Sequence, residues 1–266
     1  MLTARQQHCL RGIGVRCWRP RADSDHNPPA TDLVAAEAEV DIAPAIAAPQ
    51  PGESRPTTIR VMPPVAATDS VQVPAATPID IAALDSWDEI IAAIQQCSAC
   101  ELSQNCTQKV PGVGARQADL LIVGEGPGHD EDLRGEPFVG RSGQLLDRML
   151  AAIGIAREQV FITNIVKCRP PNNRDPRSEE AAQCRAYLDA QIRQLQPRLI
   201  LAVGRVSAHN LLDSKLPVGK LIQHMHQLPG TDIPLKVTYH PAYLLRNPAA
   251  KAIAWQDMKL LQRMLR

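Results

Sequence analysis

Short apolar runs and amphipathic stretches alternate along the second half of the chain. Each run is four to six residues long and is bounded by polar residues or glycine, which is typical of a buried parallel strand. The stretches between the runs repeat apolar residues every three or four positions, which predicts helices. The expected strands are Asp119–Gly124, Val160–Ile165, Arg198–Val203 and Leu235–Thr238, and the expected helices are Gln144–Ile153, Ser178–Leu195, Val206–Leu212 and Lys251–Leu265. This alternation predicts an α/β fold with helices on both faces of a parallel sheet.

The N-terminal third of the chain has a different composition. Residues 23–80 are rich in Ala, Pro and Asp and contain no aromatic residue, so they cannot bury enough apolar surface to offset the entropy of ordering. Ser86 is a typical N-cap residue, and it is followed by an acidic first turn and by apolar residues at helical spacing, so a helix is expected to begin here. The arginine-rich segment around Trp18 is a candidate docking site for a partner protein, although an unstructured terminus is the simpler interpretation. The sequence therefore predicts a disordered acidic tail (residues 1–84) and one folded domain (residues 85–266).

Charge is divided unevenly between these parts. Residues 1–90 hold 7 Lys/Arg and 12 Asp/Glu, and residues 91–266 hold 22 and 16, so the total of +1 hides an acidic tail and a basic domain. A basic domain suggests an anionic partner, although ordinary surface charge explains the same numbers equally well. No apolar run approaches the roughly 18 residues of a membrane span. The N-terminus also lacks the apolar core of a secretory signal. We expect a cytoplasmic monomer without membrane contact.

The glycine-rich turn GEGPG (residues 124–128) follows the first expected strand. Open α/β sheets hold ligands at the carboxyl ends of their strands, and glycines there let backbone N–H groups approach a ligand closely. The turn lacks the spacing of a phosphate-binding loop, and the acidic run at 130–132 would repel phosphates. An uncharged polar ligand is therefore expected here. Phe138, one of only two Phe in the chain, follows in the sequence PFVG.

Two later segments also follow expected strands. Asn164 can present both a donor and an acceptor to a base edge, although a turn cap is an equally good interpretation. His240 begins a predicted loop, HPAYLLRNP, that also carries Leu244, Leu245 and Arg246. A single His is more often structural than catalytic. A loop that exposes paired leucines beside an arginine is harder to explain as ordinary surface.

The cysteines form a pattern of their own. Cys97 and Cys100 form a CxxC motif, and fifteen residues separate Cys168 from Cys184. The remaining cysteines are Cys9, Cys17 and Cys106. Structural disulfides are rare in the cytoplasm, so two paired and two distant thiolates fit either tetrahedral Zn²⁺ or an iron–sulfur cluster. The spacing does not separate these two, and buried thiols without a metal are the third interpretation.

These motifs together resemble the family 4 uracil-DNA glycosylases, the iron–sulfur members of the uracil glycosylase superfamily. The resemblance rests on GEGPG, GEPFVGRSGQLLD, TNIVKCRPPNNR, HPAYLLRNP and the spaced cysteines, and it covers roughly residues 90–266. It implies a three-layer α/β/α fold with a central four-stranded parallel sheet. It also implies hydrolysis of the N-glycosidic bond of uracil in single- or double-stranded DNA. The implied ligands of a 4Fe–4S cluster are Cys97, Cys100, Cys168 and Cys184.

The same resemblance assigns the base pocket. The backbone of Gly124 and Gly126 would meet the carbonyl edge of the uracil, and Phe138 would stack on its ring. Asn164 would accept a hydrogen bond from N3–H and donate one to O4, which cytosine cannot satisfy. His240 would donate to O2 as negative charge develops on the departing base.

The remaining assignments concern water and DNA. Glu125 matches the family motif and is the expected group that positions water, with Glu131 as the alternative. Leu244 or Leu245 would fill the gap in the duplex, and Arg246 would contact phosphates. Two other interpretations stay open: a non-catalytic iron–sulfur module that binds nucleic acid, and a zinc-stabilised α/β binding protein.

Overall fold

The computed structural model describes residues 80–266, so the predicted tail lies outside the described residues except for its last five positions. Six strands form one mixed sheet in the order β1-β3-β2-β4-β6-β5. The strands are β1 (Val113–Gly114), β2 (Leu120–Gly124), β3 (Phe161–Asn164), β4 (Leu199–Val203), β5 (Met225–Gln227) and β6 (Pro234–Thr238). The four central strands run parallel, and β1 and β5 pair antiparallel at the two edges.

The sequence predicted the four central strands to within one residue at each end. The expected four-stranded parallel sheet is nevertheless too small, because it is the centre of a six-stranded mixed sheet. The edge strands β1 and β5 are only two and three residues long and are partly or fully exposed. No apolar run marks such strands, so the pattern of buried positions missed them.

The helices are α2 (Trp87–Gln96), α3 (Leu102–Asn105), α4 (His129–Arg134), α5 (Arg141–Ala152), α6 (Ser178–Leu195), α7 (Arg205–Leu212), α8 (Val218–Leu221), α9 (Pro241–Arg246) and α10 (Lys251–Met264). Four short 3-10 helices are η1 (Ile81–Ala83), η2 (Arg157–Gln159), η3 (Pro171–Asn173) and η4 (Pro248–Ala250). The predicted helices are confirmed to within three residues. The segment expected to be a loop after His240 is instead helix α9, because proline suits the first helical position and the His240 side chain accepts the Ala242 N–H.

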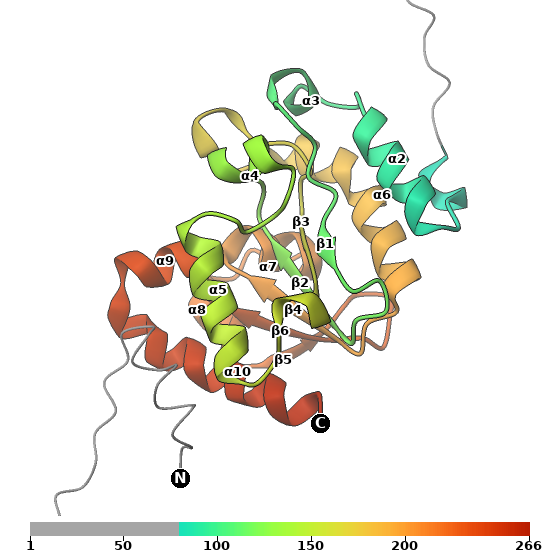
Figure 1. Cartoon of the computed structure of the whole chain (residues 1–266). Helices are drawn as coiled ribbons and strands as arrows, with labels where there is room; N and C mark the ends of the chain where they lie inside the picture. Colours follow the sequence, from blue (N-terminus) through green and yellow to red (C-terminus); the bar gives the residue numbers. More distant parts are fainter. Residues whose placement is uncertain (1–79) are drawn as a thin grey trace, which may run out of the picture. The chain divides into compact units, whose positions relative to one another are not determined.

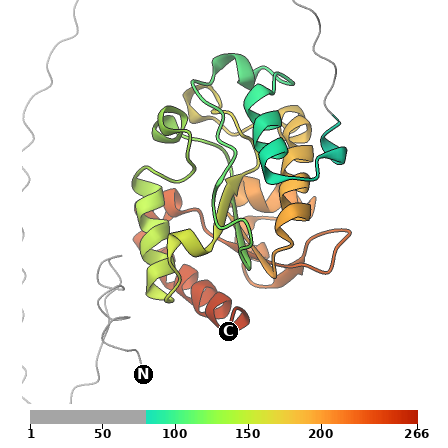
Figure 2. The same cartoon turned by 45° about the vertical axis from the view of Figure 1, so that its right-hand side comes forward.

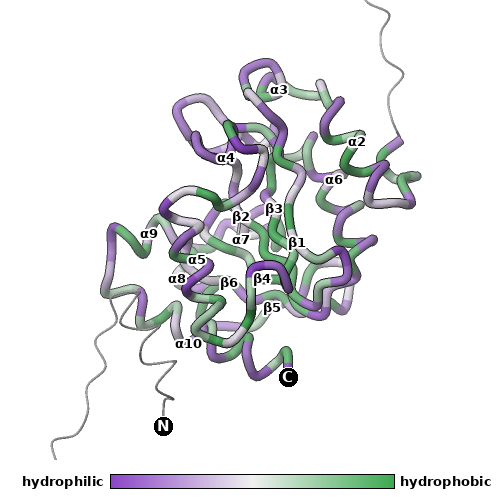
Figure 3. The backbone as a smooth tube through the Cα atoms, in the orientation of Figure 1, coloured by the Kyte–Doolittle hydropathy of each residue, from purple (hydrophilic) through white to green (hydrophobic). Residues whose placement is uncertain are grey.

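Helices cover both faces of the sheet (Figure 1). Successive residues of a strand point to opposite faces. Leu121 and Val123 of β2 therefore pack in the core under α6 and α7, whereas Leu120 and Ile122 pack in the core under α5 and α10. Every residue of β2 is buried, and apolar residues follow the central strands in Figure 3. The molecule has three layers, and its sheet is buried on both sides.

Helix α2 is held by a capping box in which Ser86 accepts from the Glu89 N–H and the Glu89 carboxylate accepts from the Ser86 N–H. Its apolar face packs on α6 through Ile90 and Ile94, which contact a small cluster around Tyr187. Figure 2 shows α2 and α6 side by side. This packing brings the CxxC motif at the end of α2 to the outer layer beside α6. No helix among residues 80–266 is long and apolar enough to cross a membrane.

Candidate active site

The carboxyl ends of the parallel strands open into a cavity of about 760 Å³. A volume in this range suits a small ligand such as a nucleobase with its sugar. Seven of the residues selected from the sequence line it: Glu125, Gly126, Glu131, Phe138, Asn164, His240 and Arg246. The parallel topology therefore brings together side chains that lie more than a hundred residues apart in the chain.

Asn164 ends β3 directly beside Gly124 of β2 in the parallel register. Asn164 is almost fully buried, with 2% of its surface exposed, and it lies in the wall of the cavity. The amide therefore offers both its donor and its acceptor to the cavity that it lines. Gly124 does not line the cavity and lies behind it. A Cβ at Gly124 would collide with Asn164 Oδ1 and come within 2.6 Å of the Phe138 ring, so glycine is required for these two side chains to approach.

His240 lies between β6 and α9, with its ring stacked near that of Phe138 at a centroid distance of 5.6 Å. Its Nδ1 accepts the Ala242 N–H at 3.2 Å, so in the neutral ring the proton resides on Nε2. Burial, followed by the nearby Arg246 charge, lowers the pKa of His240 to about 4. The imidazole is therefore a neutral donor at physiological pH. Gly204, at φ +93°, lies against it: a Cβ there would be 2.9 Å from the His240 Cβ.

The Glu131 carboxylate faces the cavity but is already engaged. It accepts hydrogen bonds from the backbone N–H groups of Gly128, Val139 and Gly140 at 3.0 to 3.1 Å. These contacts fasten the loop that carries Phe138 to the start of α4. On the other side of this loop, Arg157 donates to the Pro137 carbonyl at 2.6 Å.

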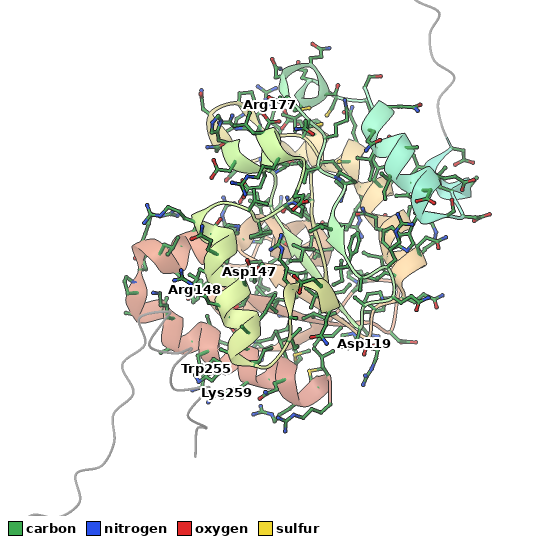
Figure 4. All side chains as sticks on the ribbon, viewed as in Figure 1. Asp119, Asp147, Arg148, Arg177, Trp255 and Lys259 are labelled. Carbon is green, nitrogen blue, oxygen red and sulfur yellow. The ribbon has the colours of Figure 1, made fainter. Side chains whose placement is uncertain are left out.

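Arg157 is itself held by Asp147 at 2.8 Å, and Asp147 projects from α5 (Figure 4). The position of Phe138 is thus fixed by contacts on both flanks of its loop. Phe138 needs this support because its own φ of +54° lies in the left-handed region, which is unfavourable for a bulky residue.

Glu125 lies in the same cavity as a second carboxyl group, that of Asp175, which is close enough to act on its charge. Burial and this neighbour raise the pKa of Glu125 to about 7, while the charge of Arg205 acts in the opposite direction. Arg205 forms an ion pair with Asp175. The sequence analysis missed both Asp175 and Arg205. The sequence could have indicated Arg205, because this residue follows the third predicted strand, at the edge of the sheet where ligands bind.

Helix α9 separates the two leucines that the sequence could not distinguish. Successive helical residues point about 100° apart. Leu244 is 1% exposed and packs in the core with Trp255 and Met258 of α10, so its assignment to DNA is wrong. Leu245 is 39% exposed, and Arg246 lies at the rim of the cavity. Of the two leucines, Leu245 is therefore the exposed one, and it lies between Tyr243, which is equally exposed, and Arg246 on the same helix.

The five cysteines within residues 80–266 are free thiols. Cys97, Cys100, Cys168 and Cys184 line a second small cavity, which Cys106 does not line. Its other walls are largely apolar and include Ile94, Leu102 and Val166. In the described part of the chain, no three His, Cys, Asp or Glu side chains are grouped so that they could hold a single metal ion.

Lys167 connects this cysteine cavity to the base pocket. Its buried ammonium group donates to the Asn164 carbonyl and to Gln191 Oε1, both at 2.8 Å, and to Thr163 Oγ1 at 2.7 Å. The next residue in the chain is Cys168. The backbone at Asn164 is therefore held in place by Lys167, the residue directly before Cys168.

Residues 111–259, more than half of the chain, match the family described as the uracil DNA glycosylase superfamily. Type-4 relatives are 39–44% identical to the chain, whereas type-5 relatives are 27% and 31% identical. The type-4 uracil-DNA glycosylase of Archaeoglobus fulgidus is 42% identical over 182 residues, which cover 66% of this chain and 92% of the relative.

The type-4 uracil-DNA glycosylase of Pyrobaculum aerophilum is 43% identical over 63% of this chain and 88% of its own length. That of Thermotoga maritima is 44% identical over 58% of this chain and 80% of its own length. The chain belongs to the type-4 uracil-DNA glycosylase family.

Proposed function

We propose that the chain hydrolyses the N-glycosidic bond of uracil in DNA, releasing free uracil and leaving an abasic site for repair. The observation that carries the proposal is the convergence of three groups in one cavity: the Phe138 ring, the amide of Asn164 and the neutral imidazole of His240. The similarity to type-4 uracil-DNA glycosylases supports the same activity.

The pocket selects the base through hydrogen bonds. A glycosylase must rotate its nucleotide out of the duplex and enclose the base in a pocket. Uracil stacks on Phe138, its N3–H donates to Asn164 Oδ1, and its O4 accepts from Asn164 Nδ2. Cytosine has an unprotonated N3 and an amino group at C4, so it reverses both contacts and leaves two buried polar pairs mismatched.

The chemistry requires stabilisation of the leaving uracil and a placed water molecule. As the bond between C1′ and N1 breaks, negative charge develops on uracil O2, and His240 Nε2–H donates to it. Glu125 orients the water that adds to C1′. Glu131 is the less suitable group for this role, because three backbone N–H donors already occupy its carboxylate. Its role in the proposal is to hold the loop of Phe138.

The DNA itself is held by the end of α9. The exposed Leu245 fills the space left by the extruded nucleotide, and Arg246 binds a neighbouring phosphate. Both side chains follow His240 on one short helix. Binding of the DNA strand by Leu245 and Arg246 therefore also sets the position of the base relative to the His240 imidazole.

The four cysteines of the second cavity are the proposed ligands of a 4Fe–4S cluster. The donors are all thiols and the walls are mostly apolar, which matches the chemistry of such clusters. Cluster ligands bind separate iron atoms and therefore stand farther apart than ligands of one ion. When bound, the group would supply a covalent cross-link between the end of α2, the segment after β3 and the N-terminal half of α6. The hydrolysis itself is carried by the residues of the cavity.

The test is release of free uracil from a uracil-containing oligonucleotide, run on single and double strands. We expect release from the parent chain and a loss of roughly 100-fold or more in His240→Ala, because a donor to developing charge is removed. The control is His224→Ala, since His224 is exposed and lies outside the cavity. A parent chain that binds the oligonucleotide without releasing uracil would instead favour the non-catalytic binding module.

A further inference from the structure

Glu125 shares the cavity with an acidic and a basic residue that the mechanism above leaves unused. We propose that Asp175 and Arg205 are positioning residues that orient the Glu125 carboxyl group and determine the pH below which uracil excision stops. This inference rests on the proposed function and adds two residues to it. Neither residue touches the uracil in the proposed arrangement, so both act through Glu125.

The three residues come from three separate loops at the same edge of the sheet. Glu125 follows β2, Asp175 lies between η3 and α6, and Arg205 is the first residue of α7 after β4. All three line the cavity. Arg205 Nη2 donates to Asp175 Oδ2, and the Asp175 carboxyl group acts on the charge of Glu125 in the same cavity. The order of the contacts is therefore Glu125, Asp175, Arg205, with Asp175 in the middle.

Two neighbouring carboxyl groups repel each other when both are charged, so the neutral form of a buried one is favoured. Asp175 is in an ion pair with Arg205, and Glu125 is the buried carboxyl group beside this pair. The pKa of about 7 for Glu125 agrees with this arrangement, since burial and Asp175 raise it and Arg205 lowers it. Near neutral pH, Glu125 therefore exists in comparable amounts of the acid and the carboxylate.

The other charged groups of the cavity have partners of their own. Arg174 makes a bidentate contact with Glu180 at 2.6 and 2.8 Å. Glu131 is bound by three backbone N–H groups. His240 is neutral, and Arg246 lies at the end of α9, where it acts on His240. Asp175 and Arg205 are accordingly the two groups that govern the charge of Glu125.

Only the carboxylate form of Glu125 can accept a proton from water. In the hydrolysis, the water oxygen forms a bond to C1′ while the bond from C1′ to N1 breaks and its electron pair leaves with uracil. The water proton passes to Glu125. Protonated Glu125 is far too weak a base for this transfer, so excision falls as the pH drops through its pKa.

The experiment measures single-turnover uracil release by the full chain between pH 5 and 9. The parent rate is expected to fall on the acid side with a midpoint near pH 7. Asp175→Asn removes the neighbouring negative charge, so its midpoint moves down by about one pH unit. Arg205→Met removes the positive charge, so its midpoint moves up. A purely structural role would not move the two midpoints in opposite directions.

The matched controls are Asp189→Asn and Arg185→Met, which remove an ion pair of the same kind from the surface of α6. They are expected to leave the midpoint in place. Carbon-13 NMR of the Glu125 carboxyl, with Glu125→Gln to assign the signal, gives the same midpoints without DNA. Equal midpoints in the parent, Asp175→Asn and Arg205→Met would overturn the inference. A parent chain that releases no uracil at any pH, while the NMR midpoints still shift as expected, would overturn the proposed function alone.

Discussion

Glu125→Gln is expected to abolish most uracil excision and yet to stabilise the fold. In the parent chain the pKa of Glu125 is raised from its ordinary 4.5 to about 7. In this interval the folded chain binds a proton that the unfolded chain has released, so stability falls as the pH rises from 4.5 to 7 and stays lower above it. Such a shift corresponds to roughly 3 kcal/mol at most. Because solvent still reaches part of the carboxyl group, we expect about 1–2 kcal/mol.

Glutamine keeps the shape of the Glu125 side chain but carries no charge. Urea unfolding at pH 8 should therefore show Glu125→Gln to be more stable than the parent by about 1–2 kcal/mol. The difference should shrink as the pH is lowered toward 4.5 and below, where Glu125 becomes protonated in the unfolded chain as well. Glu158→Gln, at an exposed position outside the cavity, is the control and should show no such gain. A Glu125→Gln variant that is less stable than the parent at pH 8 would refute the reasoning.

Three further predictions follow from the geometry. Asn164→Asp replaces the donor to O4 with an acceptor, so the activation barrier for uracil excision should rise by about 1–3 kcal/mol or more, and a trace of cytosine excision should appear. If the variant excised uracil at the parent rate, Asn164 would not be the residue that reads the base. Gly204→Ala forces a Cβ to within 2.9 Å of His240 at a φ of +93°, so single-turnover excision should drop while the chain still folds by circular dichroism. Cys168→Ala should lose iron and soluble yield, whereas Cys106→Ala should keep both; iron loss in Cys106→Ala would contradict the ligand assignment.

The apolar pattern predicted the centre of the fold because burial is periodic in the sequence. The β2 run from Leu120 to Gly124 is buried on both faces and therefore reads as continuous apolar residues. Helix α5 begins three residues before its predicted start, since Arg141 and the two residues after it add no apolar position except a buried glycine. The helical state of Pro241–Arg246 was missed, because six residues are too few for a periodic pattern to be read.

The same limit applies to the candidate site. Glu125, Asn164 and His240 could be selected because each follows an expected strand, where parallel sheets gather their ligands. Asp175 could not. It lies eleven residues beyond Asn164, on a loop whose course depends on positive φ values at Asn172 and Asn173. No local pattern reports where such a loop returns, so its approach to Glu125 is information that only the folded chain contains.

Helix α9 has a consequence for how undamaged DNA is passed over. His240 caps its first turn and Arg246 ends it, so in the proposed function the imidazole and the phosphate-binding side chain lie at the two ends of one short helix. Six helical residues span about 9 Å. The helix therefore acts as a ruler, because a base must be drawn out of the duplex by a set depth before its O2 meets Nε2. The O2 atom of a base that remains stacked never comes within hydrogen-bond distance of His240 Nε2. The protein can therefore move along intact DNA without testing each base in its cavity.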